Sequence, residues 1–129
     1  MTAPATRVDE VRFEVRDHVA TVTIDRQHVL NAVDGEGTGR LNEIWAEIER
    51  TDVRCVVLTG AGEKAFCVGA DVSAQAVDKT GLEYWADLEP NGFGGFSLRE
   101  TPAVPVIARV NGYALGGGTE LDDRSVVER

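Results

Sequence analysis

The sequence predicts a single α/β domain in which helices flank a β-sheet. Two observations favour this class. An amphipathic helix pattern stands between apolar runs of strand length, and the two most apolar of these runs are each followed by a glycine-rich segment. At 129 residues the chain suffices for one domain and is too short for two.

The first part of the chain predicts a β-hairpin. Residues 1–10 are polar, and we expect them to be flexible. Residues 11–15 and 19–24 alternate apolar and polar side chains, as half-buried strands do. Residues 16–18 between them are few enough for a tight turn.

A helix and a strand are predicted next. Residues 26–39 contain three glycines and are expected to be irregular. The residues that follow fall at i, i+3, i+4 and i+7 on one face of a helix: Leu41, Ile44, Trp45 and Ile48. Residues 54–59 are almost continuously apolar, which is typical of a strand buried on both faces. Strand, helix and strand together imply a crossover and a sheet covered by helices.

The second part of the chain alternates loops with short elements. Residues 60–73 are punctuated by glycine and predict a loop. Short helices are expected at residues 81–88 and 96–100, and residues 105–110 predict a second buried strand.

Composition excludes some classes of function. The chain has 22 Asp and Glu against 13 Lys and Arg, a formal net charge of -9. A duplex nucleic-acid binder needs a basic face, so that class is excluded. A small anionic ligand is compatible with an acidic protein, because a pocket can be locally basic or lined by backbone N–H groups.

Cysteines, histidines and termini predict a soluble cytoplasmic protein without a metal centre. Cys55 and Cys67 lack metal-ligand spacing and form no cluster with His18 or His28. They are expected to be reduced thiols, with a disulfide as the alternative. Residues 1–6 do not form a signal peptide, and no apolar run is long enough to span a membrane.

Two segments share a form that suggests a ligand site. Residues 66–71 and 111–120 each come after a predicted buried strand and carry glycine. Three successive glycines, at positions 116–118, cost backbone entropy on folding. They are useful where main-chain N–H groups must be bare, or where a helix must begin facing a developing anion. An ordinary loop is the alternative for such a triplet.

These segments resemble a known family. Residues 110–121 (Val-Asn-Gly-Tyr-Ala-Leu-Gly-Gly-Gly-Thr-Glu-Leu) closely resemble the most characteristic segment of the enoyl-CoA hydratase/isomerase (crotonase) family. Residues 66–71 (Phe-Cys-Val-Gly-Ala-Asp) resemble its other signature, and residues 29–32 (Val-Leu-Asn-Ala) its N-terminal loop. Residues 101–107 agree in order and spacing, so the resemblance covers residues 11–121.

The resemblance implies a crotonase-like ββα spiral fold, truncated, with β-sheets flanked by helices. Family chains are about twice this long, so we expect residues 11–121 to correspond to an N-terminal half-core. Residues 122–129 are expected to be an atypical charged tail. The family forms homo-oligomers, trimers or hexamers, and the short chain counts against that assembly here.

The resemblance also implies catalytic roles. The backbone N–H groups of Ala70 and Gly117 would hydrogen-bond the thioester carbonyl oxygen of an acyl-CoA and stabilise the enolate. Glu120 would orient and deprotonate the water that adds to the β-carbon. Coenzyme A is part of the substrate, so no separate cofactor and no metal is implied.

Substrate-binding roles are implied for further positions in these loops. Gly69 and Asp71 would shape the first loop, and Gly116 the glycine turn. Ala32, Val72 and Ser73 would lie along the pantetheine arm or the nucleotide.

Each chemical role has a plainer alternative. Glu120 could be one solvated acid among the 22. For Asp71, a loop-capping side chain bonded to nearby N–H groups is favoured over direct catalysis. Cys67 has no evident partner base and is interpreted as a small buried residue, not a nucleophile.

Residues 60–65 offer a competing motif. They match the dinucleotide-binding pattern G-x-G-x-x-G/A after a strand. That pattern requires a helix to begin inside it, and residues 66–71 show no helical period.

Two functional hypotheses follow. The first is an acyl-CoA enzyme that adds water across an enoyl-CoA double bond. The alternative is a truncated, non-catalytic remnant that is unstable or associates with a full-length relative.

Overall fold

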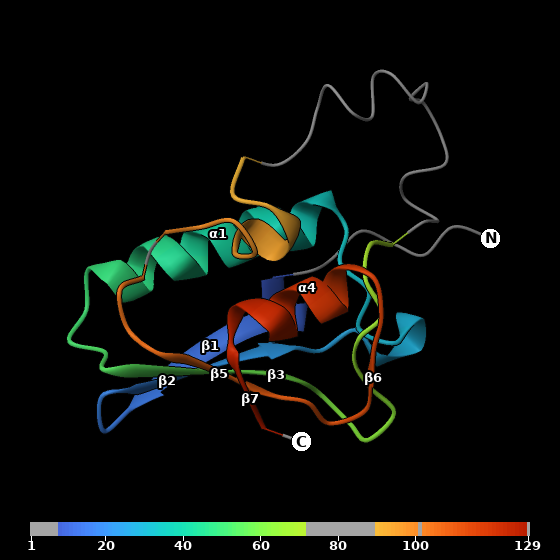
Figure 1. Ribbon diagram of the computed structural model, residues 1–129, viewed down its shortest axis with the longest axis horizontal. Helices are drawn as coiled ribbons and strands as arrows, with labels where there is room; N and C mark the ends of the chain where they lie inside the picture. Colours follow the sequence, from blue (N-terminus) through green and yellow to red (C-terminus); the bar gives the residue numbers. More distant parts are fainter. Residues whose placement is uncertain (1–7, 72–89, 101, 129) are drawn as a thin grey trace.

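The computed structural model describes residues 8–71, 90–100 and 102–128, and it has the α/β architecture that the sequence predicts (Figure 1). In chain order its elements are η1 (Val8–Glu10), β1 (Val11–Arg16), β2 (Val19–Ile24), η2 (Gln27–Val29), α1 (Gly35–Glu49), β3 (Cys55–Gly60), β4 (Ala65–Cys67), η3 (Phe93–Gly95), β5 (Val106–Arg109), β6 (Tyr113–Ala114), α4 (Gly117–Arg124) and β7 (Val126–Glu128). Among these residues no helix combines the length and the apolar character needed to cross a membrane.

A five-stranded sheet in the order β1-β2-β3-β5-β7 forms the base of the fold. β1 is antiparallel to β2, and the remaining pairs are parallel. The predicted hairpin is confirmed: Asp17 and His18 have φ values of 50° and 66°. Positive φ at both central residues is the signature of the tight two-residue turn that matches strand twist.

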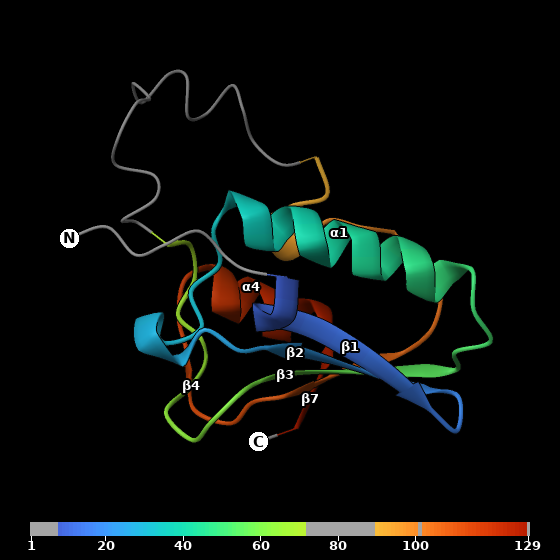
Figure 2. The same ribbon diagram turned by 180° about the vertical axis from the view of Figure 1, so that it is seen from behind.

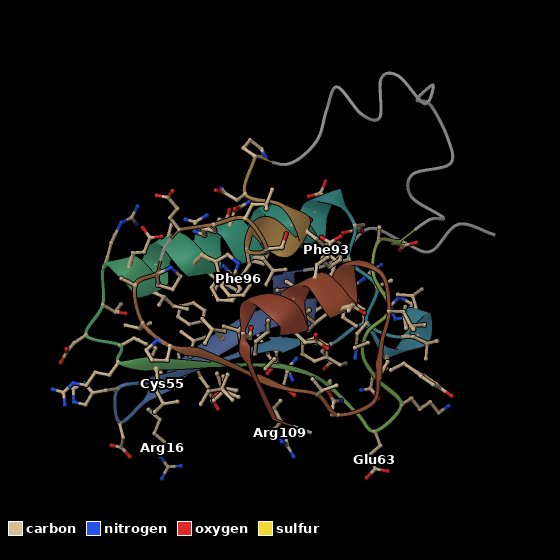
Figure 3. All side chains as sticks on the ribbon, in the orientation of Figure 1. Arg16, Cys55, Glu63, Phe93, Phe96 and Arg109 are labelled. Carbon is tan, nitrogen blue, oxygen red and sulfur yellow. The ribbon has the colours of Figure 1, made fainter. Side chains whose placement is uncertain are left out.

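Both longer helices lie on the same side of this sheet, as the two opposite views show (Figures 1 and 2). Leu41, Ile44, Trp45 and Ile48, the predicted apolar face of α1, are all buried. The ring of Trp45 stacks on Phe96 with centroids 4.9 Å apart. In Figure 3, Phe93 and Phe96 lie in the layer of the helices, whereas Arg16, Glu63 and Arg109 point away from it.

The prediction that the central strands are buried on both faces is wrong. In β3, Val56 and Leu58 are fully buried, while Cys55 and Val57 are only half-buried. The burial alternates because, among the described residues, helices cover one face of the sheet only.

Helix α1 begins earlier than predicted. Residues 26–39 were expected to be irregular, yet the helix starts at Gly35. The side chain of Asp34 accepts a hydrogen bond from the Gly37 backbone nitrogen at 2.7 Å. This N-cap satisfies one of the orphan donors of the first turn, which offsets the low helix propensity of the glycines.

The segment after the predicted loop also differs. Residues 96–100 form no helix. The short 3-10 helix lies instead at Phe93–Gly95, with Gly94 and Gly95 both at φ 65°. These left-handed glycines turn the chain back sharply. The helix predicted at residues 81–88 lies outside the described residues.

Three strands, β4, β6 and β7, lie where the sequence predicts none. β4 lies in the expected loop of residues 60–73 and pairs with β6 in a separate two-stranded sheet. β7 lies within residues 122–129, the segment set apart as a tail, and pairs with β5 in parallel. The small sheet stands beside the N-terminal end of α4 and so positions the candidate site (Figures 1 and 2).

Candidate active site

The two glycine-bearing segments meet in space. A Cβ placed on Gly69 would lie 3.1 Å from the Leu115 carbonyl oxygen and 3.2 Å from the Gly117 nitrogen. Just before this contact, the Leu115 nitrogen donates to the Cys67 carbonyl oxygen at 3.1 Å. The pairing of β4 with β6 therefore continues into a close approach of the two loops, and the φ of 101° at Gly69 is one that favours glycine.

Ala70 is held by an isolated bridge to Val33. The Val33 nitrogen donates to Gly69 O at 2.9 Å, and the Asp71 nitrogen donates to Val33 O at 2.8 Å. In such a parallel bridge the residue between these two bonds directs its own N–H away from the partner strand. The N–H of Ala70 thus points away from Val33, and among the described residues no acceptor takes it.

Gly117 is the first residue of α4. The next three N–H groups are occupied by carbonyl oxygens of the preceding turn: that of Gly118 by Leu115, and those of Thr119 and Glu120 by Gly116. Within the described part of the chain, no acceptor takes the N–H of Gly117. A bare N–H at the positive end of a helix favours a negative charge.

Each glycine of the triplet has its own structural reason. Gly116 has φ 53°, a left-handed conformation that turns the chain into α4. A Cβ on Gly117 would overlap the ring of Phe93. A Cβ on Gly118 would overlap the carbonyl group of Cys67. The close packing at the junction, where residues 66–71 meet residues 111–120, therefore requires these glycines, and the triplet is not an ordinary loop.

Glu120 lies in the first turn of α4. Its side chain is exposed, and no described residue hydrogen-bonds or pairs with its carboxylate. The neighbouring Thr119 hydroxyl donates to Ala114 O at 3.0 Å, which ties this turn to β6. The carboxylate therefore stands on the helix turn that begins at Gly117.

The flanking acid is buried. Asp71 is only 4% exposed, and its Oδ2 accepts from Nη1 of Arg26 at 3.2 Å. This contact favours a structural role over direct catalysis. Arg26, whose side chain is fully buried, was not among the predicted site residues.

Of the remaining predicted substrate-binding residues, one is described by the structure and two are not. Ala32 is buried beside Val33, next to the bridge with Ala70, so it is brought to the junction. Val72 and Ser73 lie outside the described residues.

Cys67 is buried, as predicted. Burial raises the pKa of its thiol to about 11, and the hydrogen bond from the Gly69 nitrogen lowers it by less. A neutral thiol without solvent contact is a poor nucleophile.

The dinucleotide-binding alternative is wrong. Gly60 ends β3 and Ala65 begins β4, so no helix opens inside residues 60–65. No group of three or more metal-ligating side chains is placed for a metal ion in residues 8–71, 90–100 and 102–128.

Comparisons with known proteins agree on one family. A family model for enoyl-CoA hydratase/isomerase matches residues 14–123. The chain is 41% identical over 114 residues to an (E)-benzylidenesuccinyl-CoA hydratase of Thauera aromatica, covering 86% of this chain and 43% of the relative. It is 39% identical over 120 residues to a short-chain-enoyl-CoA hydratase of Clostridium acetobutylicum, covering 88% and 43%.

A solved structure gives the same likeness in three dimensions. The carnitinyl-CoA hydratase of Mycobacterium avium superposes with a TM-score of 0.81 at 40% identity, covering 95% of this chain and 46% of that one. The chain thus spans less than half the length of the relatives that it matches.

Proposed function

The chain belongs to the enoyl-CoA hydratase/isomerase family and has its crotonase-like α/β fold, and from that premise we propose that it binds an acyl-CoA thioester and adds water across an enoyl double bond. One observation carries this proposal. Two segments distant in sequence meet at Gly69 and Gly117, and the N–H groups of Ala70 and Gly117 have no acceptor among the described residues.

These two N–H groups are proposed to hydrogen-bond the thioester carbonyl oxygen. As negative charge develops on that oxygen, fixed backbone dipoles and the positive end of α4 stabilise it without reorganising. Removal of one such donor typically lowers the rate by about 10²–10³. The coenzyme A moiety would run past Ala32, so the substrate itself supplies the carrier group.

Glu120 is proposed as the proton-transfer group. Its carboxylate takes a proton from water as the water oxygen bonds to the β-carbon, and the π electrons of the double bond move to the α-carbon and the carbonyl oxygen as an enolate. The protonated carboxyl group then supplies a proton to the α-carbon. This step regenerates the carboxylate, and one water has been added.

A hydration assay tests the proposal. Crotonyl-CoA absorbs in the near ultraviolet through its conjugated enoyl thioester, and addition of water removes that absorbance. The proposal predicts a saturable loss of absorbance that requires the folded chain. A folded chain that leaves crotonyl-CoA unchanged at all concentrations would refute it.

A further inference from the structure

A buried arginine lies at the centre of three acids. The side chain of Arg26 is fully buried. Its guanidinium lies 3.4 Å from Glu10, 3.9 Å from Asp34 and 3.2 Å from Asp71, measured between the nearest nitrogen and carboxylate oxygen. These carboxylates are at most 9% exposed. The group draws together η1, the residue before α1, and the loop after β4.

The guanidinium also joins the two segments that the Val33–Ala70 bridge pairs. Nη1 of Arg26 donates to Ala32 O at 2.9 Å and to Asp71 Oδ2 at 3.2 Å. Ala32 directly precedes Val33, and Asp71 directly follows Ala70, while Val33 and Ala70 form the isolated bridge. One nitrogen therefore joins the residues that flank this bridge on its two sides.

Hydrogen bonds to Gly69 and Asp71 hold the residues on both sides of Ala70 in place. Gly69 is held by the bond from the Val33 nitrogen to its carbonyl oxygen. Asp71 is held through its backbone by Val33 and through its side chain by Arg26. Between two fixed residues the peptide plane that carries the Ala70 N–H has little freedom.

Stability alone is a poor reason for such a cluster. Taking an arginine and its carboxylates out of water costs several kcal/mol per ion, and a well-packed apolar replacement is often as stable. An apolar side chain cannot supply hydrogen bonds of defined direction. The planar guanidinium offers donors at fixed angles, so it holds a carbonyl and a carboxylate in one geometry.

We propose that Arg26 is a positioning residue for residues 69–71, the loop that carries the Ala70 N–H. Through Asp71 and Ala32 it sets the direction of that N–H. This inference rests on the proposed function, and it adds a residue that touches neither substrate nor reacting atoms. Its effect is expected on the enolate, because only the enolate depends strongly on that N–H.

Bound acetoacetyl-CoA gives a direct readout. Its enolate absorbs in the near ultraviolet, so the fraction bound as enolate measures how well the loop stabilises negative charge on the carbonyl oxygen. Free coenzyme A, which lacks the thioester carbonyl, measures binding by the rest of the site. A purely structural role would lower the melting temperature and leave the enolate fraction of the folded protein unchanged.

Two variants and one matched control separate these roles. Asp71→Asn replaces the charge-assisted hydrogen bond from Arg26 by a weaker neutral one and leaves Arg26 paired with two acids, and Arg26→Lys keeps the charge without the planar guanidinium. The control is Asp34→Asn, the same chemical change at a buried partner of the same arginine. Asparagine serves equally well as an N-cap, so α1 keeps its start.

We expect both test variants to lower the ratio of enolate to keto form of bound acetoacetyl-CoA by about 10- to 100-fold, since small displacements of such a donor cost this much. Their affinity for coenzyme A and the enolate ratio of the control should equal those of the unmodified chain. Test variants that fold and keep the full enolate ratio would overturn the role of Arg26 alone. An unmodified chain without any enolate signal would contradict the proposed function, and the inference with it.

Discussion

Asn31 and Asn111 donate side-chain hydrogen bonds to one carbonyl oxygen, that of Ala65, at 2.9 and 3.1 Å. Each belongs to a different segment of the family resemblance, and Ala65 is the first residue of β4. The loop that leads to Gly69 is therefore anchored at its origin by two distant parts of the chain.

Asn111→Asp should destabilise the fold. The Asn111 amide also donates to Gly62 O at 2.8 Å and accepts from the Gly60 nitrogen at 3.1 Å. An aspartate would lose both donated bonds and set a negative charge against two carbonyl oxygens. We expect the free energy of unfolding to fall by about 2–3 kcal/mol in urea titrations.

The matched substitution is Asn42→Asp on α1. The Asn42 Oδ1 accepts from Nη1 of Arg99 at 3.1 Å, so a carboxylate there would strengthen this contact, and the loss should be smaller than at Asn111. Equal losses in the two variants would contradict the role given to Asn111.

Gly118→Ala tests the close packing of the junction. The added Cβ would overlap the Cys67 carbonyl, a backbone group that cannot move aside, so we expect a loss of about 2–3 kcal/mol by thermal and urea unfolding. Gly39→Ala is the control, because nothing lies within 4 Å of its Cβ and the residue is inside α1. There the substitution should stabilise by about 0.5–1 kcal/mol. Similar effects at the two positions would refute this account of the triplet.

The pKa of Cys67 predicts a pH dependence of stability. In the folded protein burial raises the pKa from 9.0 to about 11, so the folded state holds this proton more tightly than the unfolded state. The contribution of Cys67 to the free energy of unfolding is therefore constant below pH 9 and declines as the pH rises through this window. Unfolding of the unmodified chain should show a steeper decline there than unfolding of Cys67→Ala. Equal slopes would contradict the burial of this thiol.

Glu120→Gln tests the proton-transfer role. The amide keeps the size of the side chain and cannot accept the proton of water, so turnover of crotonyl-CoA should fall at least about 100-fold. Binding of acetoacetyl-CoA, which needs the backbone donors, should remain close to that of the unmodified chain. Glu14→Gln, at an exposed position on β1, should change neither. Undiminished turnover in Glu120→Gln would remove that residue from the mechanism.

Much of the fold was predictable because local periodicity reports local structure. The hairpin followed from alternation, and the buried face of α1 from Leu41, Ile44, Trp45 and Ile48. The meeting of the two glycine segments was implied by resemblance, since spacing alone does not say which loops of a sheet approach each other.

The missed features depend on single side chains or on long-range pairing. The start of α1 depends on the cap from Asp34, which outweighs the glycines. The partners of β4 and β7 are strands elsewhere in the chain, which short apolar runs do not specify.

Arg26 did leave a signal in the sequence. Ala20, Val22 and Ile24 are buried, and Arg26 continues their period of two. A charged residue in phase with a buried face requires buried partners of opposite charge. The three acids that supply them come from separate segments, so the sequence alone did not identify them.

The central claim is that the junction of Gly69 and Gly117 binds the carbonyl of an acyl-CoA thioester. Thermal unfolding with acetoacetyl-CoA, compared with free coenzyme A at equal concentration, tests it most directly. A ligand at about 100 times its Kd adds roughly 2.7 kcal/mol to the free energy of unfolding. The account predicts a cooperative transition that acetoacetyl-CoA shifts upward by more than coenzyme A does. A cooperative transition that both leave unchanged, or that both shift equally, would contradict it.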